Sequence, residues 1–140
     1  MKILFCGLPG SGKSTIAEIV AWNLKAIWIN ADKVREHYND WDFTHEGRIR
    51  QSQRMKYLAD GVVMAGKIAI ADFVAPTVQA RENFSADKVV WMDTIKEGRF
   101  EDTNKIFEPL DESEYGLRID SWFNDKDEVV KKVINWYNGN

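Results

Sequence analysis

The feature that most restricts the fold is a nine-residue run near the start of the chain. Residues 7–15 read Gly-Leu-Pro-Gly-Ser-Gly-Lys-Ser-Thr, which fits the pattern Gly-x-x-x-x-Gly-Lys-Ser/Thr. A short apolar run at residues 3–6 precedes it and predicts a buried strand, and apolar residues at helical spacing follow it over 12–24. A strand, a glycine-rich turn and a helix in this order form the context in which this pattern holds phosphate groups. The sequence therefore predicts a phosphate-binding loop (P-loop) at residues 7–15.

Each residue type in the loop has a physical role. Glycines let the backbone wrap closely around phosphate oxygens, and the N–H groups at the start of the helix point a positive dipole at them. The ammonium of Lys13 would face the β- and γ-phosphates, and the Ser14 hydroxyl would bind Mg²⁺. An unrelated glycine turn is the alternative, and the order of the glycines does not fit a dinucleotide site. We expect ATP to contact Gly7, Pro9, Gly10, Ser11, Gly12, Lys13, Ser14 and Thr15.

Strands and helices alternate along the rest of the chain. Apolar runs predict strands at 27–29, 67–73, 89–92 and 117–119, and helical spacing predicts helices at 32–38, 44–64, 79–84 and 126–137. Residues 99–115 are polar and weakly periodic, so we expect a loop or lid there. Alternation of this kind is typical of an α/β fold whose parallel sheet is covered on both faces. We expect one three-layer domain over residues 1–140, of the nucleoside-kinase-like P-loop NTPase class, with a five-stranded parallel sheet.

Composition argues against several classes of function. The net charge is −3, and because affinity for a polyanion rises with the number of cationic contacts, a long nucleic acid is not an expected partner. Cys6 is the only cysteine, which leaves neither an internal disulfide nor a thiolate zinc site. No apolar run approaches the roughly 20 residues that span a bilayer, and no leader-like segment precedes the first strand. We expect a reduced, cytoplasmic protein without membrane contact, with most of its six tryptophans in the core.

Two aspartates follow predicted strands, at the carboxyl edge where open α/β sheets bind ligands. Asp32 would act as the base for an accepting hydroxyl or as a ligand of Mg²⁺-bound water, and it would also cap the helix that follows. Arg35 lies three residues further along and can face the same cleft. Asp72 would help to bind Mg²⁺, although a capping role explains its position equally well.

Arginines and aromatic residues supply further candidates. Arg50 and Arg54 share a helical face with Arg48 nearby, which fits either an anion site or a solvated helix surface. Phe43 and Phe107 lie in polar surroundings, where they could stack on a base or belong to the core. Spacing alone does not decide between these roles.

With these residues in view, the chain resembles a known family, the adenylylsulfate (APS) kinases, which use MgATP to phosphorylate the 3′-hydroxyl of adenosine 5′-phosphosulfate. Residues 7–15 are almost the family's usual loop, and residues 30–35, Asn-Ala-Asp-Lys-Val-Arg, are similar to its Asp-Gly-Asp-Asn-x-Arg segment. Residues 43–54 carry counterparts of its Phe-Ser, Arg and Asn-Ile-Arg-Arg elements. Residues 105–111 resemble its Lys-Asn-Phe-Thr-Gly-Ile-Asp segment.

The resemblance implies roles on the acceptor side, where two phenylalanines would enclose the adenine of the accepting nucleotide. The residues implied in its binding are Asp32, Arg35, Phe43, Arg48, Gln51, Lys105 and Phe107. Ala75 stands where the family has a serine that can be phosphorylated, which excludes a phosphorylated-enzyme step at this position. The stretch between Thr94 and Lys105 is far shorter than the family's lid, and Arg99 is the candidate for a lid cation.

The sequence thus predicts a kinase that moves the γ-phosphate of ATP to a hydroxyl of a small nucleotide, with APS as the expected acceptor. Lys13, Asp32 and Arg35 are the expected catalytic residues, and Ser14, Asp32 and Asp72 are the expected residues around Mg²⁺. Two alternatives stay open. One is a kinase of the same fold for a nucleoside, a modified base or a polynucleotide 5′-hydroxyl; the other is a nucleotide-binding module without turnover. The oligomeric state is also open, a homodimer being one option.

Overall fold

A computed structural model describes residues 1–139 and contains a five-stranded sheet in which every neighbouring pair of strands is parallel. The strands follow the order β2-β3-β1-β4-β5. Their bounds are β1 (Lys2–Cys6), β2 (Ile27–Asn30), β3 (Ala69–Asp72), β4 (Lys88–Met92) and β5 (Leu117–Ile119). The predicted α/β class and the parallel sheet are confirmed.

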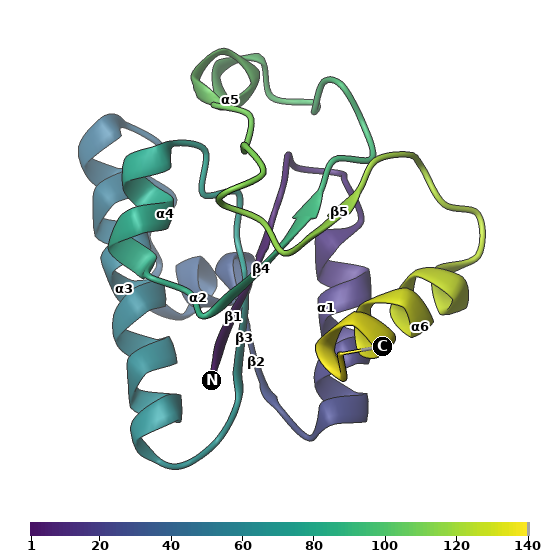
Figure 1. Ribbon diagram of the computed structural model, residues 1–140. Coiled ribbons are helices and arrows are strands. Elements are labelled where there is room, and N and C mark those ends of the chain that lie inside the picture. The colour runs from purple at the N-terminus through teal and green to yellow at the C-terminus, as the bar shows by residue number, and fades with distance from the viewer. Residues whose placement is uncertain (140) are drawn as a thin grey trace.

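Helices cover both faces of the sheet, so the fold has three layers (Figure 1). The ribbon shows α1 and α6 on one side of the sheet, and α3 and α4 on the other. The helices are α1 (Lys13–Leu24), α2 (Ala31–Tyr38), α3 (His45–Met64), α4 (Val78–Phe84), α5 (Glu101–Ile106) and α6 (Lys126–Tyr137). Among residues 1–139, no helix combines the length and the apolar content that crossing a bilayer requires.

Strand β1 explains how one sheet supports two cores. Side chains alternate between the faces of a strand, so Ile3 and Phe5 pack toward α1 and α6, whereas Leu4 and Cys6 pack toward α3. All four side chains are buried. With both faces filled in this way, β1 holds its carboxyl end, where the P-loop begins, in a fixed place.

Two local expectations are wrong. Asn30, not Asp32, caps α2, because the helix starts at Ala31 directly after β2 and the Asn30 side chain accepts a hydrogen bond from the Lys33 backbone N–H at 3.0 Å. The stretch expected to be loop contains the short helix α5, which lies above the carboxyl edge of the sheet in Figure 1. This edge therefore has a structured cover.

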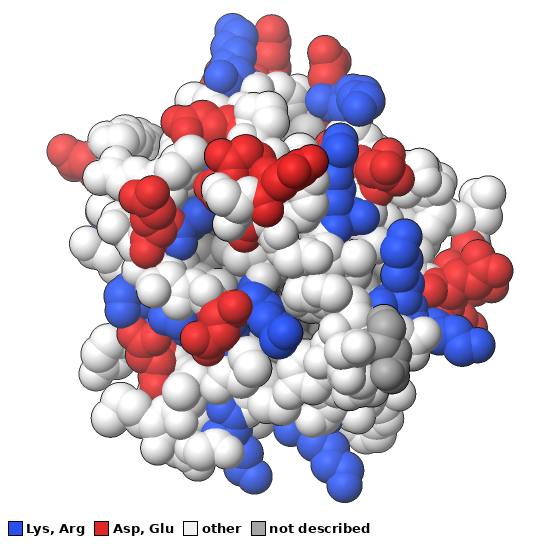
Figure 2. Space-filling view, in the orientation of Figure 1, with Lys and Arg blue, Asp and Glu red and all other residues white. Residues whose placement is uncertain are grey.

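Charged side chains are mixed on the face of the molecule shown in Figure 2, where Lys and Arg lie among Asp and Glu and no area of one sign dominates. The tryptophans differ from expectation. Trp22, Trp41 and Trp122 are exposed, so half of the six lie outside the core. One of these exposed rings borders a cavity beside the P-loop.

Candidate active site

The P-loop joins β1 to α1, as the sequence predicted. Gly10 and Gly12 have φ angles of +87° and +88°, a left-handed conformation that a side chain would strain. The far side of the loop is held by the segment after β4, because the Thr94 hydroxyl donates to the Ser11 carbonyl oxygen at 2.6 Å. Ser11 itself is fully buried. The loop conformation is thus fixed from both ends before any ligand binds.

Lys13 is buried at the start of α1, and its Nζ donates to the Leu8 carbonyl oxygen at 3.4 Å. Burial lowers the pKa of Lys13, and the negative charges of Asp72 and Asp32 act in the opposite direction. An ammonium has three donors, and one long bond to a carbonyl leaves it weakly satisfied. Lys13 is therefore arranged to gain from an anion in the loop.

Ser14 and Asp72 form the centre of the site. The Ser14 hydroxyl donates to Asp72 Oδ1 at 2.8 Å, across the carboxyl ends of two neighbouring strands. Asn30 donates to both oxygens of Asp72, and the indole N–H of Trp28 donates to Oδ2. Burial raises the pKa of Asp72, while the hydrogen bonds from Trp28, Ser14 and Asn30 act in the opposite direction.

The donor set at Ser14 and Asp72 suits Mg²⁺, which prefers oxygen ligands and is usually held by one or two carboxylates together with substrate phosphates. Among residues 1–139, no group of three or more His, Cys, Asp or Glu side chains could hold a metal ion by itself. A site of this kind depends on the phosphates to complete the coordination of the ion.

An arginine and aromatic cluster lies at the start of α3. The guanidinium of Arg35 lies over the Phe43 ring at 4.3 Å, and that of Arg48 lies 5.8 Å from the same ring. Arg35 is buried and donates to the carbonyl oxygens of Asp40 and Asp42 at 3.0 and 3.2 Å. Arg48 donates to the Phe43 carbonyl oxygen at 2.9 Å. The structure thus brings together three of the expected acceptor residues, and Phe43 as a residue is 54% exposed, which leaves it accessible to a ligand.

The other expected acceptor residues are more dispersed. Asp32 is exposed on the first turn of α2, and its charge acts on both Lys13 and Arg35. Gln51 is buried and donates to the Ala31 carbonyl oxygen at 2.9 Å, while its own Oε1 has no partner among residues 1–139.

Phe107 and Lys105 come from the segment that covers the site. The Phe107 ring lies 6.0 Å from the guanidinium of Arg81, so the two phenylalanines contact different arginines. Lys105 is exposed and lies 3.8 Å from Glu101 on the same short helix, which turns it toward solvent. The structure does not bring Lys105 into the cluster around Phe43.

Sequence reasoning missed the acidic partners of the α3 arginines. Asp40 Oδ2 lies 2.8 Å from Arg50 Nε and 2.8 Å from Arg54 Nη1. Hydrogen bonds from Arg50, the Asp42 backbone and Arg54 hold the pKa of Asp40 well below its usual range. Arg50 and Arg54 are therefore ion-paired within the protein, and Arg48 is the arginine of this helix that faces the Phe43 cluster. The aspartates just before α3 were the available signal.

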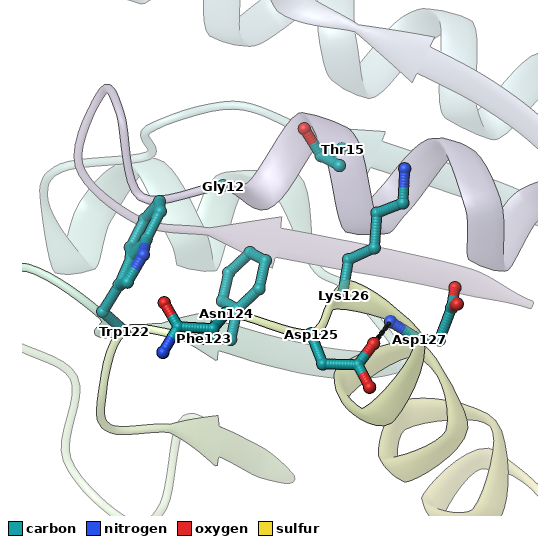
Figure 3. Close-up of a pocket in the computed structure, with 8 residues that line it drawn as sticks. All are labelled: Gly12, Thr15, Trp122, Phe123, Asn124, Asp125, Lys126 and Asp127. Carbon is teal, nitrogen blue, oxygen red and sulfur yellow. Dashed lines mark hydrogen bonds between the residues drawn. The ribbon is translucent and has the colours of Figure 1, made fainter.

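A cavity of about 420 Å³ adjoins the other side of the P-loop. Figure 3 shows two aromatic rings, Trp122 and Phe123, beside Gly12 and near Thr15. The rings stack at 4.9 Å between centroids with 22° between their planes. The lining residues are Gly12, Thr15, Trp122, Phe123, Asn124, Asp125, Lys126 and Asp127. Sequence reasoning missed this pair, although two adjacent aromatic residues just after the last predicted strand could have indicated it.

Comparison with known proteins identifies the family. The sequence model of the family described as adenylylsulphate kinase matches residues 1–96, which is more than half of the chain. The chain belongs to the adenylylsulphate kinase family. A bifunctional enzyme of Xylella fastidiosa, CysN/CysC, is 38% identical over 100 residues, which are 64% of this chain and 16% of that protein. The matches to this and other curated relatives, several of them adenylyl-sulfate kinases, span 14% to 48% of the relatives' lengths.

Solved structures share the fold of this adenylylsulphate kinase family member. The APS kinase CysC of Mycobacterium tuberculosis, in complex with AMPPNP and APS, has a TM-score of 0.76 at 21% identity, covering 98% of this chain and 96% of that chain. A sugar kinase from Janibacter has a TM-score of 0.79 at 20% identity, covering 98% and 94%. Because kinases of different substrates share the architecture this closely, the fold by itself does not identify the acceptor.

The match to the family model covers only part of the candidate site. Residues 1–96 include the P-loop, Asp32, the Phe43 cluster and Asp72. Phe107, Lys105 and the Trp122–Phe123 pair follow the matched part. The phosphate cradle and most acceptor candidates thus lie in the part of the chain that the family model matches, and the cover of the site follows that part.

Proposed function

We propose that the protein is an APS kinase, which transfers the γ-phosphate of MgATP to the 3′-hydroxyl of adenosine 5′-phosphosulfate. One observation carries the proposal. The Ser14–Asp72 pair and Lys13 lie at the carboxyl edge of the sheet, the same edge at which α2 presents Asp32 and Arg35. Phosphate binding and acceptor binding would thereby meet at one edge, as transfer between two bound nucleotides requires.

On the donor side, backbone N–H groups of the P-loop and Lys13 would bind the β- and γ-phosphates of ATP. Ser14 and Asp72 would hold Mg²⁺, whose positive charge would offset the negative charge that develops during transfer. The exposed face of Trp122 would stack on the adenine in the cavity beside Gly12 and Thr15. These residues fix the donor in line with the acceptor edge.

On the acceptor side, Arg35 and Arg48 would bind the phosphosulfate group, and Phe43 would stack on its adenine. The 3′-oxygen then forms a bond to the γ-phosphorus, and the bond from that phosphorus to the bridging oxygen of the β-phosphate breaks. ADP leaves with the electron pair of the broken bond. Asp32, exposed at this edge, would accept the proton of the 3′-hydroxyl.

The test is a comparison of acceptors. Purified protein is incubated with MgATP and, separately, APS, nucleosides, free sugars and 5′-hydroxyl oligonucleotides, and ADP release is measured. Turnover that requires APS supports the proposal. Turnover with another acceptor only would show that this compound, and not APS, is the substrate. Tight ATP binding without turnover on any acceptor would show that the protein is a nucleotide-binding module.

Two lysine variants control this experiment. Lys13→Ala should lower kcat by at least about 100-fold, because it removes a charge aimed at the reacting phosphates. Lys132→Ala changes an exposed lysine of α6 and should leave the rate unchanged. A Lys13→Ala enzyme with nearly normal turnover would show that the phosphates bind elsewhere.

A further inference from the structure

Asn30 ends β2 directly beside Asp72, which ends β3. The two residues are register partners on neighbouring parallel strands, and both are buried. Asn30 Nδ2 donates to Asp72 Oδ1 at 3.1 Å and to Oδ2 at 3.3 Å. The same nitrogen lies 3.2 Å from the Ser14 hydroxyl oxygen. One carboxamide therefore contacts both side chains that would hold Mg²⁺.

The start of α2 fixes the orientation of the Asn30 carboxamide. Its Oδ1 accepts a hydrogen bond from the Lys33 backbone N–H at 3.0 Å, so this oxygen is committed to capping the helix. Because a carboxamide has one oxygen and one nitrogen, its NH2 group must then face Asp72. Asn30 thus connects the first turn of α2, the helix that carries Asp32 and Arg35, to the carboxylate on the phosphate side.

Asp72 accepts hydrogen bonds on both of its oxygens. Oδ1 accepts from Ser14 and Asn30, and Oδ2 accepts from Asn30 and from the indole N–H of Trp28. Asp72 is only 1% exposed, and a carboxylate removed from water in this way depends on such donors. Donors on both oxygens fix the plane of the carboxylate, so that Oδ1 stays directed at Ser14. Partners of this kind orient a metal-binding side chain before the ion arrives.

The carboxylate beside Ser14 belongs to β3 in this chain. Residues 30–35 resemble a family segment that begins with aspartate, whereas position 30 is asparagine here and the aspartate stands at its register partner, position 72. We propose that Asn30 is a positioning residue that directs Asp72 at Ser14 while it caps α2, and that the site needs one carboxylate, which either β2 or β3 can supply. This inference rests on the MgATP binding of the proposed function.

The geometry allows the two side chains to be exchanged in the double variant Asn30→Asp/Asp72→Asn. One oxygen of a carboxylate at position 30 would keep the bond from the Lys33 N–H, and the other would take the place of Nδ2, 3.2 Å from the Ser14 hydroxyl oxygen. The Trp28 N–H needs an acceptor, so a carboxamide at position 72 would turn its oxygen to Trp28 and its NH2 group to position 30. The pair would again contain one carboxylate and one amide donor beside Ser14.

Calorimetry of ATP binding, with Mg²⁺ and with a chelator in its place, tests the proposal. Asp72→Asn should lower the affinity for MgATP by about 10–100-fold, and the exchanged double variant should bind within about tenfold of the unaltered protein. Asn30→Ser keeps a residue type that caps a helix equally well but is too short to reach Asp72. It should lower the affinity for MgATP by about 10–100-fold and leave metal-free ATP binding unchanged. Asn135→Ser, at an exposed position of α6, is the matched control and should bind as the unaltered protein.

Three results would overturn the role of Asn30. The first is an Asn30→Ser protein that binds MgATP as tightly as the unaltered protein, and the second is an exchanged double variant that binds no better than Asp72→Asn. The third is an Asn30→Ser loss of equal size with and without Mg²⁺, which would show a general disturbance of the loop. Asn30→Ser decides alone if the double variant does not fold. A protein that meets these expectations but phosphorylates no acceptor would contradict the proposed function alone.

Discussion

Replacing Gly12 by alanine adds a methyl group at a position where two separate physical penalties apply. Gly12 has a φ of +88°, and a side chain in this left-handed region costs about 1–2 kcal/mol. The added Cβ would also lie 2.6 and 2.8 Å from two ring carbons of Phe123, so the ring must move. Overpacking of this kind costs about 1–3 kcal/mol. We therefore expect Gly12→Ala to lower the free energy of unfolding by about 2–5 kcal/mol.

Gly10 provides a matched control within the same loop. Its φ of +87° is almost identical, but the nearest atom to an added Cβ is Ile95 Cδ1 at 3.8 Å, which is ordinary contact. Gly10→Ala should therefore lose only the conformational part, about 1–2 kcal/mol. Urea unfolding followed by circular dichroism measures both losses of free energy. In thermal unfolding, at about 3 °C per kcal/mol for a chain of this size, the Tm values of the two variants should be visibly separate.

A double-mutant cycle isolates the contact with Phe123. In a Phe123→Ala background the ring is gone, so Gly12→Ala should cost no more than Gly10→Ala does. Equal losses for the two single glycine variants would refute the reasoning, because the Phe123 ring would then have no energetic consequence. So would an undiminished Gly12→Ala loss in the Phe123→Ala background.

Three further predictions concern buried groups. Asp72→Asn should weaken MgATP binding by about 10–100-fold in calorimetry. Burial raises the pKa of Asp72, so its carboxylate should become protonated at a pH above the usual carboxyl range. MgATP binding by the unaltered protein should therefore weaken on acidification at that pH, and binding by Asp72→Asn should not. Burial raises the pKa of Cys6 to about 12, so its thiol should react about 10³-fold more slowly with a disulfide reagent at pH 8 in the native protein than in urea. Arg81→Ala should lower the free energy of unfolding in urea by about 3–5 kcal/mol, because it leaves the Glu114 carboxylate and the Ala75 carbonyl oxygen without their partner. The double variant with Glu114→Ala should lose less than the sum of the two single losses.

The helices and strands that bury apolar residues were largely predictable from the sequence. Residues 126–137 were predicted as a helix from their apolar spacing, and α6 has these bounds. The predicted strand at 67–73 is longer than β3, because only Ala69–Asp72 pair with both neighbouring strands. Apolar runs report burial, and burial extends beyond the hydrogen-bonded part of a strand.

Helix α5 shows what local patterns leave out. Its six residues, Glu101–Ile106, are too few to display an amphipathic repeat and too few to be stable in isolation. The helix is held by contacts from distant segments, including that of Arg48 with Thr103, 55 residues apart. The Ser14–Asp72 bond spans 58 residues, yet it could be anticipated, because Asp72 ends β3, Ser14 follows the turn after β1, and the carboxyl ends of these neighbouring strands meet at one edge.

The position at which the match to the family model ends has a physical interpretation. Phosphate recognition requires backbone N–H groups, a lysine and a hydroxyl in one geometry, and residues 1–96 retain this arrangement within the matched region. A purine offers a flat face to any aromatic ring, so stacking tolerates many different side chains, and the Trp122–Phe123 pair beyond residue 96 can serve it without the family's own residues. On the proposed function, the aromatic pair that follows the match to the family model would serve a role that several kinds of side chain can fill.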